Sequence, residues 1–139
     1  MLSVDEFVEN FEFLDDWEAR YAYLVELGES LPPLDEALRT EQNRVQGCLS
    51  KVWVAPLADP EDASRLRYVG DCDTAIIKGV LAVLIELMSG HTPQEIEALD
   101  IDTLFERIQL AEHLSPNRHF GIYAIVELMK SQARDCAVG

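Results

Sequence analysis

The fold is decided by residues 52–88, which read VWVAPLADPEDASRLRYVGDCDTAIIKGVLAVLIELM. Two short runs of β-branched and aromatic residues, 52–54 and 66–69, lie on either side of a loop rich in turn-forming residues. They predict a pair of antiparallel strands. Because a two-stranded ribbon alone is only marginally stable, we expect a third strand over residues 43–46.

Helical patterns lie on both sides of these strands. From Thr74 to Met88 there is almost no polar face, which predicts a buried central helix that Gly90 ends. Earlier in the chain, residues 15–27 repeat apolar side chains at helical spacing, and residues 4–13 predict a shorter helix. Two further helices are predicted by starts that combine an N-cap with proline, Thr92-Pro93 and Ser115-Pro116.

Helices, a small sheet and helices again give an α+β fold. We expect an antiparallel three-stranded sheet with helices packed on one face. At 139 residues the chain has the length of one domain, and we expect residues 1–139 to form it.

Composition excludes several classes of protein. The formal charge of −15 and the absence of a Lys/Arg stripe argue against binding to nucleic acid. No apolar run reaches the roughly 20 residues of a membrane span. The acidic start of the chain is unlike a secretory signal, so we expect a cytoplasmic protein. The acidic residues either form a solvated surface or steer the chain to a basic partner.

The chain contains three cysteines, Cys48, Cys72 and Cys136, with no CxxC or other close pair. A disulfide framework does not fit an odd number of cysteines in a cytoplasmic chain, and a structural zinc site has no local signature. Cys48 follows Gly47, which permits a sharp turn, where the polar stretch gives way to a strand. Cys48 is therefore either a presented nucleophile or a small buried hydrophobic residue.

Four segments resemble the SufE family in their order along the chain. RVQGCLSKVWV (44–54) is similar to the family's QGCxSxVW signature, and GDCDTAIIKGVLAVL (70–84) to its GDSD helix start. DDWEARYAYLVELGESLPPL (15–34) resembles the N-terminal helix and turn, and EHLSPNRHFG (112–121) resembles HLTPxRxxG. The resemblance implies a SufE-like fold, which is similar to that of U-type cluster scaffolds.

The resemblance also implies a function. Cys48 would accept persulfide sulfur from a SufS-type cysteine desulfurase, stimulate that enzyme, and deliver the sulfur to an iron–sulfur cluster scaffold of the SufBCD type. The chain would then be a sulfur carrier without turnover of its own. It would need no cofactor, because the pyridoxal phosphate belongs to the desulfurase. We expect a monomer or a weak homodimer.

Other residues are carried over by their places in the matched segments. Gln46 and Gly47 would shape the active loop. Arg118 would bind a carboxylate of the partner or steady the thiolate, or it would only be a charge near the start of the last helix. Asp71, which with Asp73 flanks the start of the central helix, would either act at the site or cap that helix. Cys72 stands where relatives often have serine; it is either a second, resolving thiol or a replacement without function.

Two other classes of function remain open. The chain could be a metal-binding or cluster-binding scaffold of the U type that uses Cys48 and Cys72. It could also be a cysteine-nucleophile enzyme, although no histidine with an orienting Asp or Asn is evident in the sequence.

Overall fold

The structure, a computed structural model, describes residues 4–47 and 50–138. The α-helices in these ranges are α1 (Val4–Phe13), α2 (Trp17–Glu29), α3 (Ala75–Met88), α4 (Pro93–Ala98), α5 (Ile101–Arg107) and α6 (Pro116–Val138). Two short 3₁₀ helices, η1 (Glu36–Leu38) and η2 (Leu110–His113), and two strands, β1 (Val52–Ala58) and β2 (Leu66–Cys72), complete the described elements. The α+β expectation is confirmed.

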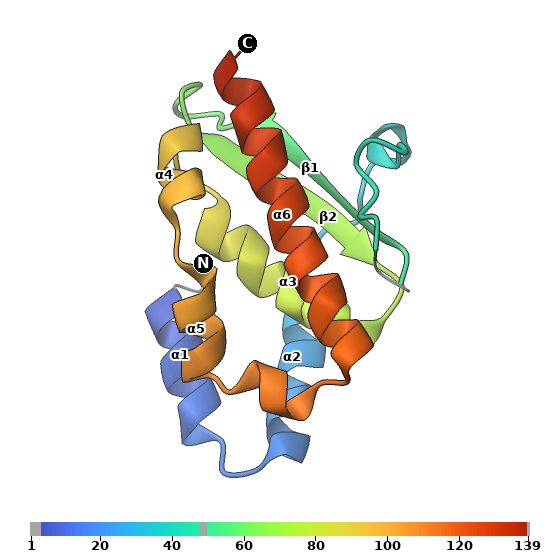
Figure 1. The fold of residues 1–139 in the computed structure, drawn as a ribbon, viewed down its shortest axis with the longest axis vertical. Coiled ribbons are helices and arrows are strands. Elements are labelled where there is room, and N and C mark those ends of the chain that lie inside the picture. Colours follow the sequence, from blue (N-terminus) through green and yellow to red (C-terminus); the bar gives the residue numbers. More distant parts are fainter. Residues whose placement is uncertain (1–3, 48–49, 139) are drawn as a thin grey trace.

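The strands form an antiparallel ribbon whose register pairs Val52 with Cys72 and Ala58 with Leu66. Side chains alternate along β2, so that Leu66, Tyr68 and Cys72 are buried. The Tyr68 hydroxyl donates to the backbone oxygen of Met129 in α6, at 2.6 Å. This contact ties the buried face of the ribbon to the last helix, which runs across it in Figure 1.

The expected third strand at residues 43–46 is wrong. In the described part of the chain the sheet has two strands, and this segment contributes one isolated bridge, between Arg44 and Trp53. Two backbone bonds flank that bridge: Val45 N to Val52 O and Val54 N to Asn43 O, both 2.9 Å. A turn precedes the segment and a left-handed residue, Gly47, follows it, so the ladder cannot extend.

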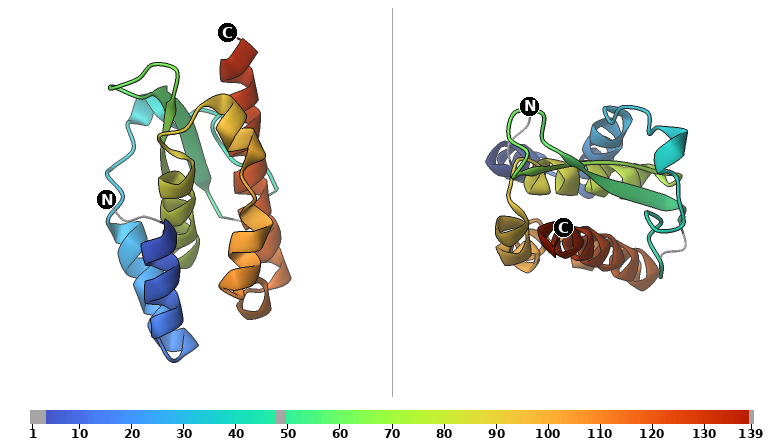
Figure 2. Two further views of the ribbon diagram at one scale, coloured as in Figure 1. Left: turned by 90° about the vertical axis from the view of Figure 1, so that its left-hand side faces the viewer. Right: turned by 90° about the horizontal axis from the view of Figure 1, so that it is seen from above.

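The central helix α3 lies between α2 on one side and α6 on the other (Figure 2). Eight of its side chains and Gly79 are buried, as the apolar sequence predicts. Gly79 allows close approach of α2, because a Cβ there would lie 2.1 Å from the backbone oxygen of Leu24. The crossing of α2 and α3 therefore depends on glycine at this position.

Helix starts largely follow the sequence, but α5 begins at a start that the sequence analysis did not predict. Thr92 and Glu95 form the expected capping box of α4. The helix stops after Ala98, and Asp100 caps a separate α5 by accepting a hydrogen bond from Thr103 N at 3.1 Å. Among the described residues no helix is long and apolar enough to cross a membrane.

Candidate functional site

The predicted sulfur acceptor, Cys48, lies outside the described residues, so its neighbours along the chain define the candidate site. Gly47 precedes it with φ of 83° and is exposed. A Cβ built on Gly47 meets nothing within 4 Å. Glycine is therefore favoured here by the left-handed backbone rather than by crowding.

The chain after Cys48 is fastened to the start of α3. Ser50 Oγ and Thr74 Oγ1 share a hydrogen bond of 2.5 Å. Lys51 N donates to the Asp73 carboxylate at 2.9 Å, and Asp73 N donates to the backbone oxygen of Lys51 at 3.1 Å. These three bonds join the chain on the far side of Cys48 to the turn between β2 and α3.

Cys72 is the last residue of β2 and lies opposite Val52. Its relative exposure is 6%, and its sulfur accepts a hydrogen bond from Thr74 N at 3.4 Å. The Cys72 sulfur therefore lies next to Thr74, the residue to which Ser50 is bonded. Its predicted role as a second thiol remains a prediction.

Asp71 forms ion pairs with side chains from two other segments. Arg39 Nη2 lies 2.7 Å from its Oδ2, and Lys78 Nζ lies 3.2 Å from its Oδ1. Its Oδ1 also accepts a hydrogen bond from the backbone of Cys72, at 2.9 Å. Partial burial acts to raise the pKa of Asp71, but these hydrogen bonds outweigh it and hold the pKa below its ordinary value. Asp71 is therefore a carboxylate bound by Arg39, Lys78 and the backbone of Cys72. It does not cap α3, whose N-cap residue is Thr74.

Two arginines lie over the indole of Trp53, which pairs with Asp71 across the ribbon. The guanidinium carbon of Arg39 is 5.1 Å from the ring centroid, and that of Arg44 is 5.8 Å. Sequence reasoning missed Arg39 because it lies in a polar stretch without periodicity. Nothing in the sequence signals its pairing with a carboxylate 32 positions later.

Gln46 and Arg118 are exposed, and each has hydrogen bonds to residues within five positions along the chain. Gln46 Nε2 lies 3.4 Å from Glu41 Oε1, and Arg118 N donates to Ser115 Oγ at 3.4 Å in the first turn of α6. In the parts of the chain that the structure covers, no ion pair joins Arg118 to Asp71. The predicted roles of Gln46 and Arg118 stay predictions.

His113 and His119 both pack against aromatic side chains. The His113 ring stacks on Trp17 with centroids 3.7 Å apart, and the Tyr21 hydroxyl donates to its backbone oxygen. His119 contacts the ring of Tyr123 edge-on at 4.9 Å. Within residues 4–47 and 50–138, no three His, Cys, Asp or Glu side chains gather closely enough to hold a metal ion.

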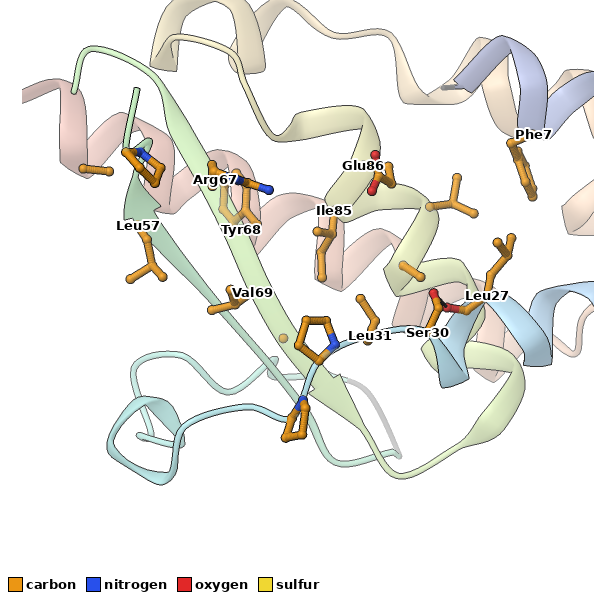
Figure 3. Close-up of a pocket in the computed structure, with 17 residues that line it drawn as sticks. Phe7, Leu27, Ser30, Leu31, Leu57, Arg67, Tyr68, Val69, Ile85 and Glu86 are labelled. Carbon is orange, nitrogen blue, oxygen red and sulfur yellow. Dashed lines mark hydrogen bonds between the residues drawn. The ribbon is translucent and has the colours of Figure 1, made fainter. Parts of the chain in front are cut away.

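A separate apolar cavity of about 570 Å³ opens beside β2 (Figure 3). Its walls come from Phe7 of α1, the end of α2, the following Leu31–Pro33 segment, both strands with Pro60 from the loop between them, and α3. None of the described residues predicted for the site, from Gln46 to Arg118, lines this cavity. The described site residues therefore do not line this cavity, although Gly70 in its wall directly precedes Asp71.

Comparison with known proteins identifies the family. The SufE family, described as an Fe–S metabolism associated domain, matches residues 5–133. A SufE-like protein of Rhizobium meliloti (strain 1021) is 41% identical over 135 residues, which cover 96% of each chain. A SufE-like protein of Rhizobium etli is 40% identical over 136 residues, which cover 96% of this chain and 91% of the relative. Both relatives are described as uncharacterized.

The fold has a match among solved structures. A solution structure of a hypothetical protein from Thermus thermophilus superimposes with a TM-score of 0.78, and the alignment covers 100% of both chains. Its sequence identity of 20% shows a shared fold alone. Matched across nearly its whole length and about 40% identical to SufE-like relatives, the chain belongs to the SufE family, whose domain is associated with iron–sulfur metabolism.

Proposed function

We propose that the chain is a sulfur carrier that accepts a persulfide sulfur on Cys48 from a SufS-type cysteine desulfurase. It stimulates the desulfurase and delivers the sulfur to a SufBCD-type cluster scaffold. The observation that carries the proposal is the QGCLS sequence at residues 46–50 of a SufE-family chain, with a left-handed Gly47 directly before the cysteine.

The transfer is an exchange at sulfur. The Cys48 thiolate attacks the outer, sulfane sulfur of the desulfurase cysteine persulfide. A bond forms between the Cys48 sulfur and the sulfane sulfur, and the bond from the sulfane sulfur to the desulfurase cysteine breaks. The electron pair leaves on the desulfurase thiolate, so no external oxidant or reductant is needed. Cys48 then holds one additional sulfur atom as a persulfide.

The neighbours of Cys48 suit this chemistry. Gly47 is exposed and its surroundings are open, which leaves room for a partner's backbone to approach. Lys51 is exposed three positions after Cys48, and a nearby cation favours a thiolate. Ser50 and Lys51 are anchored to the α3 start, which restricts the chain on that side. These features support a nucleophile presented on a short constrained loop.

The remaining parts of the proposal follow from the carrier role. The chain turns over nothing independently and uses no cofactor of its own, since pyridoxal phosphate is bound by the desulfurase. It acts in the cytoplasm as a single domain over residues 1–139, as a monomer or a weak homodimer. Arg118, exposed in the first turn of α6, contacts a carboxylate of the partner or steadies the thiolate.

One observation favours a second candidate, a U-type scaffold that binds iron or zinc through Cys48 and Cys72. Cys72 lies beside Thr74, which also holds Ser50 two residues after Cys48. Metal analysis of anaerobically purified protein, with and without Cys48→Ala, separates the two functions. A stoichiometric metal that is lost in the variant favours the scaffold.

The deciding experiment supplies the purified protein with desulfurase and cysteine. Intact mass should rise by about one sulfur mass, and peptide mapping should place the addition on residue 48. Cys48→Ser should abolish both the addition and the stimulation of the desulfurase, with unchanged circular dichroism. Cys136→Ser is the matched control, because Cys136 is exposed near the end of α6. Sulfur addition at Cys72 instead, or none with an active desulfurase, would refute the proposal.

A further inference from the structure

The register of the ribbon decides which backbone groups of β2 face away from β1. Asp73 N donates to Lys51 O, just beyond one end of the paired stretch. Because hydrogen-bonded pairs alternate along an antiparallel ladder, the odd-numbered residues of β2 are the ones that bond to β1. The even-numbered residues, from Leu66 to Cys72, therefore direct their N–H and C=O groups to the opposite edge of the strand.

One part of this edge has partners and another does not. Leu66 N donates to the backbone oxygen of His91 at 2.8 Å, and Tyr68 N donates to Ser89 Oγ at 3.0 Å. Among the described residues, the structure gives no hydrogen bond to Tyr68 O or to either backbone group of Gly70. Unpaired N–H and C=O groups on a strand edge are a template for an additional strand. The unpaired stretch is short and ends at Gly70.

This unpaired stretch is part of the wall of the apolar cavity. Gly70 has no side chain, so the wall that it contributes is backbone. In the view of Figure 3, Leu27 and Leu31 lie on the opposite side of the cavity from β2. The volume of about 570 Å³ is typical of ligand sites in proteins. A strand edge inside an apolar cavity suits an extended peptide, because a peptide supplies both apolar side chains and backbone partners.

Helix α3 adds a carboxylate to the same cavity. Ala82 and Glu86 both line it and are four positions apart, so they lie on one face of the helix. Glu86 is partly buried, and within the described ranges of the chain no ion pair involves it. Burial raises the pKa of Glu86, although positive charges, Arg67 among them, act against this effect. A partly buried carboxylate without an ion pair favours a basic side chain on the ligand, and so does the formal charge of −15.

We propose that this cavity binds an extended segment of a partner protein, which adds to β2 as an antiparallel strand and carries an apolar residue followed two positions later by a basic one. The apolar residue pairs with Gly70 and exchanges two backbone hydrogen bonds with it. The backbone N–H of the basic residue donates to Tyr68 O, and its side chain binds Glu86. The inference goes beyond the proposed function and involves neither Cys48 nor the residues beside it.

The spacing of the two side chains follows from the geometry of helix and strand. Four residues of a helix cover about 6 Å, and two residues of a strand cover about 7 Å. A Cβ on Gly70 would lie 3.3 Å from Leu81, near the middle of α3, whereas Tyr68 is bonded to Ser89, directly after its end. β2 and α3 therefore run in opposite directions here. A strand antiparallel to β2 follows the direction of α3 and meets Glu86 with its second inward-facing side chain.

The test titrates isotope-labelled protein with the peptide acetyl-Val-Leu-Val-Lys-Val-amide and follows the backbone amide signals by NMR. Binding should shift the signal of Gly70 and slow its hydrogen exchange, because its N–H gains a partner. N-methylation of the peptide leucine removes the donor to Gly70 O and should raise Kd about fivefold. N-methylation of the central valine is the matched control. It should leave Kd within about twofold, because that N–H points away from β2.

The preference for a basic residue is tested from both sides of the contact. Replacing the peptide lysine by glutamate should raise Kd about threefold, and Glu86→Lys should reverse this preference. Glu86→Gln keeps the shape of the side chain and should abolish the preference. Glu106→Lys is the matched control, because it changes the net charge equally at an exposed position of α5 outside the cavity. It should keep the preference of the wild-type protein.

Several results would overturn the inference. They are a Gly70 signal unchanged at millimolar peptide, equal weakening by the two N-methylations, and a preference for lysine that survives Glu86→Lys. Binding of N-acetylleucinamide as tight as that of the peptide would assign the cavity to a small apolar molecule and would also contradict strand pairing. If Glu86→Lys fails to fold, Glu86→Gln and the two peptides carry the same comparison. The titration contains no desulfurase, so its result does not depend on sulfur transfer.

Discussion

Ser50 and Thr74 share a 2.5 Å hydrogen bond between their hydroxyl groups, which joins the chain two residues after Cys48 to the residue that precedes α3. The bond is partly buried, and Thr74 makes no side-chain cap to the helix. Its hydroxyl is instead bonded to Ser50 and donates to the Asp73 carboxylate at 3.3 Å. The contact between Ser50 and Thr74 links the candidate acceptor segment to the buried central helix α3.

Removing either hydroxyl should weaken the fold and slow sulfur transfer. Ser50→Ala and Thr74→Val should each lower the free energy of unfolding by about 1 kcal/mol, measured by urea denaturation. The double variant should lose less than the sum, because the two changes share one bond. Ser64→Ala removes an exposed hydroxyl bonded to Asp62 in the β1–β2 loop and should not change transfer. Strict additivity of the two losses would contradict a shared bond.

Glycine at position 47 should matter for transfer beyond its effect on stability. Gly47 and Gly90 have nearly the same left-handed backbone, with φ of 83° and 81°, and nothing lies within 4 Å of a built Cβ at either. Alanine at each should therefore cost a similar free energy, about 1 kcal/mol. Thermal denaturation checks this equality.

The rate of sulfur loading on Cys48 should distinguish the substitution at Gly47 from the one at Gly90. Only Gly47→Ala should slow it, because Gly47 adjoins Cys48. Gly47→Asn should recover part of the rate, since asparagine tolerates the left-handed region better than alanine. Equal loading rates in the Gly47→Ala and Gly90→Ala proteins would show that the bend before Cys48 is not needed.

Cys72 should react slowly with thiol reagents in the native protein. Its exposure is 6%, whereas Cys136 is exposed on α6. Under native conditions, iodoacetamide should modify Cys136 first and Cys72 only after denaturant is added, as followed by peptide mass spectrometry. Rapid native labelling of Cys72 would show that the end of β2 opens readily.

The second-thiol hypothesis for Cys72 has its own measurement. Mild oxidation followed by non-reducing peptide mapping tests for a disulfide between Cys48 and Cys72. A resolving thiol should form it in the wild-type protein. Its persistent absence would leave Cys72 as a buried replacement for serine.

The ion pairs of Asp71 should make stability depend on pH. The folded-state pKa of Asp71 lies below its ordinary value of 3.8. A lowered carboxyl pKa contributes stability that is fully present above the unfolded pKa and is lost as pH falls through the folded pKa. Asp71→Asn should therefore be less stable than wild type at pH 7, and the difference should shrink below about pH 4. Urea denaturation at both ends of this range checks the sign.

The pH series needs a control because other carboxyls also have lowered pKa values, among them Asp62 and Asp100. Their contributions are common to wild type and Asp71→Asn and cancel in the difference. A difference that stays constant from pH 7 to about pH 3 would show that ionisation of Asp71 contributes nothing to stability.

Sequence patterns correctly predicted helices that are determined by residues close together in the chain. The apolar run of α3 and the Thr92–Glu95 capping box were readable because burial and capping act within one helix. The single helix expected after Thr92 divides at Leu99, where Asp100 caps a new start. The third strand was expected because a two-stranded ribbon alone is marginal, but this ribbon packs against helices instead, and a turn and the left-handed Gly47 keep residues 43–46 from extending the ladder.

The sequence by itself determined the family, the α+β class and the candidate nucleophile Cys48, because these follow from residue order and motif spacing. Only the tertiary structure decided which side chains pair with the residues before and after Cys48. It brought Arg39 to Asp71 and Ser50 to Thr74, 32 and 24 positions apart. Such pairings form only when residues 36–51 pack against the ribbon and the start of α3. Local propensity does not encode contacts between residues so far apart along the chain.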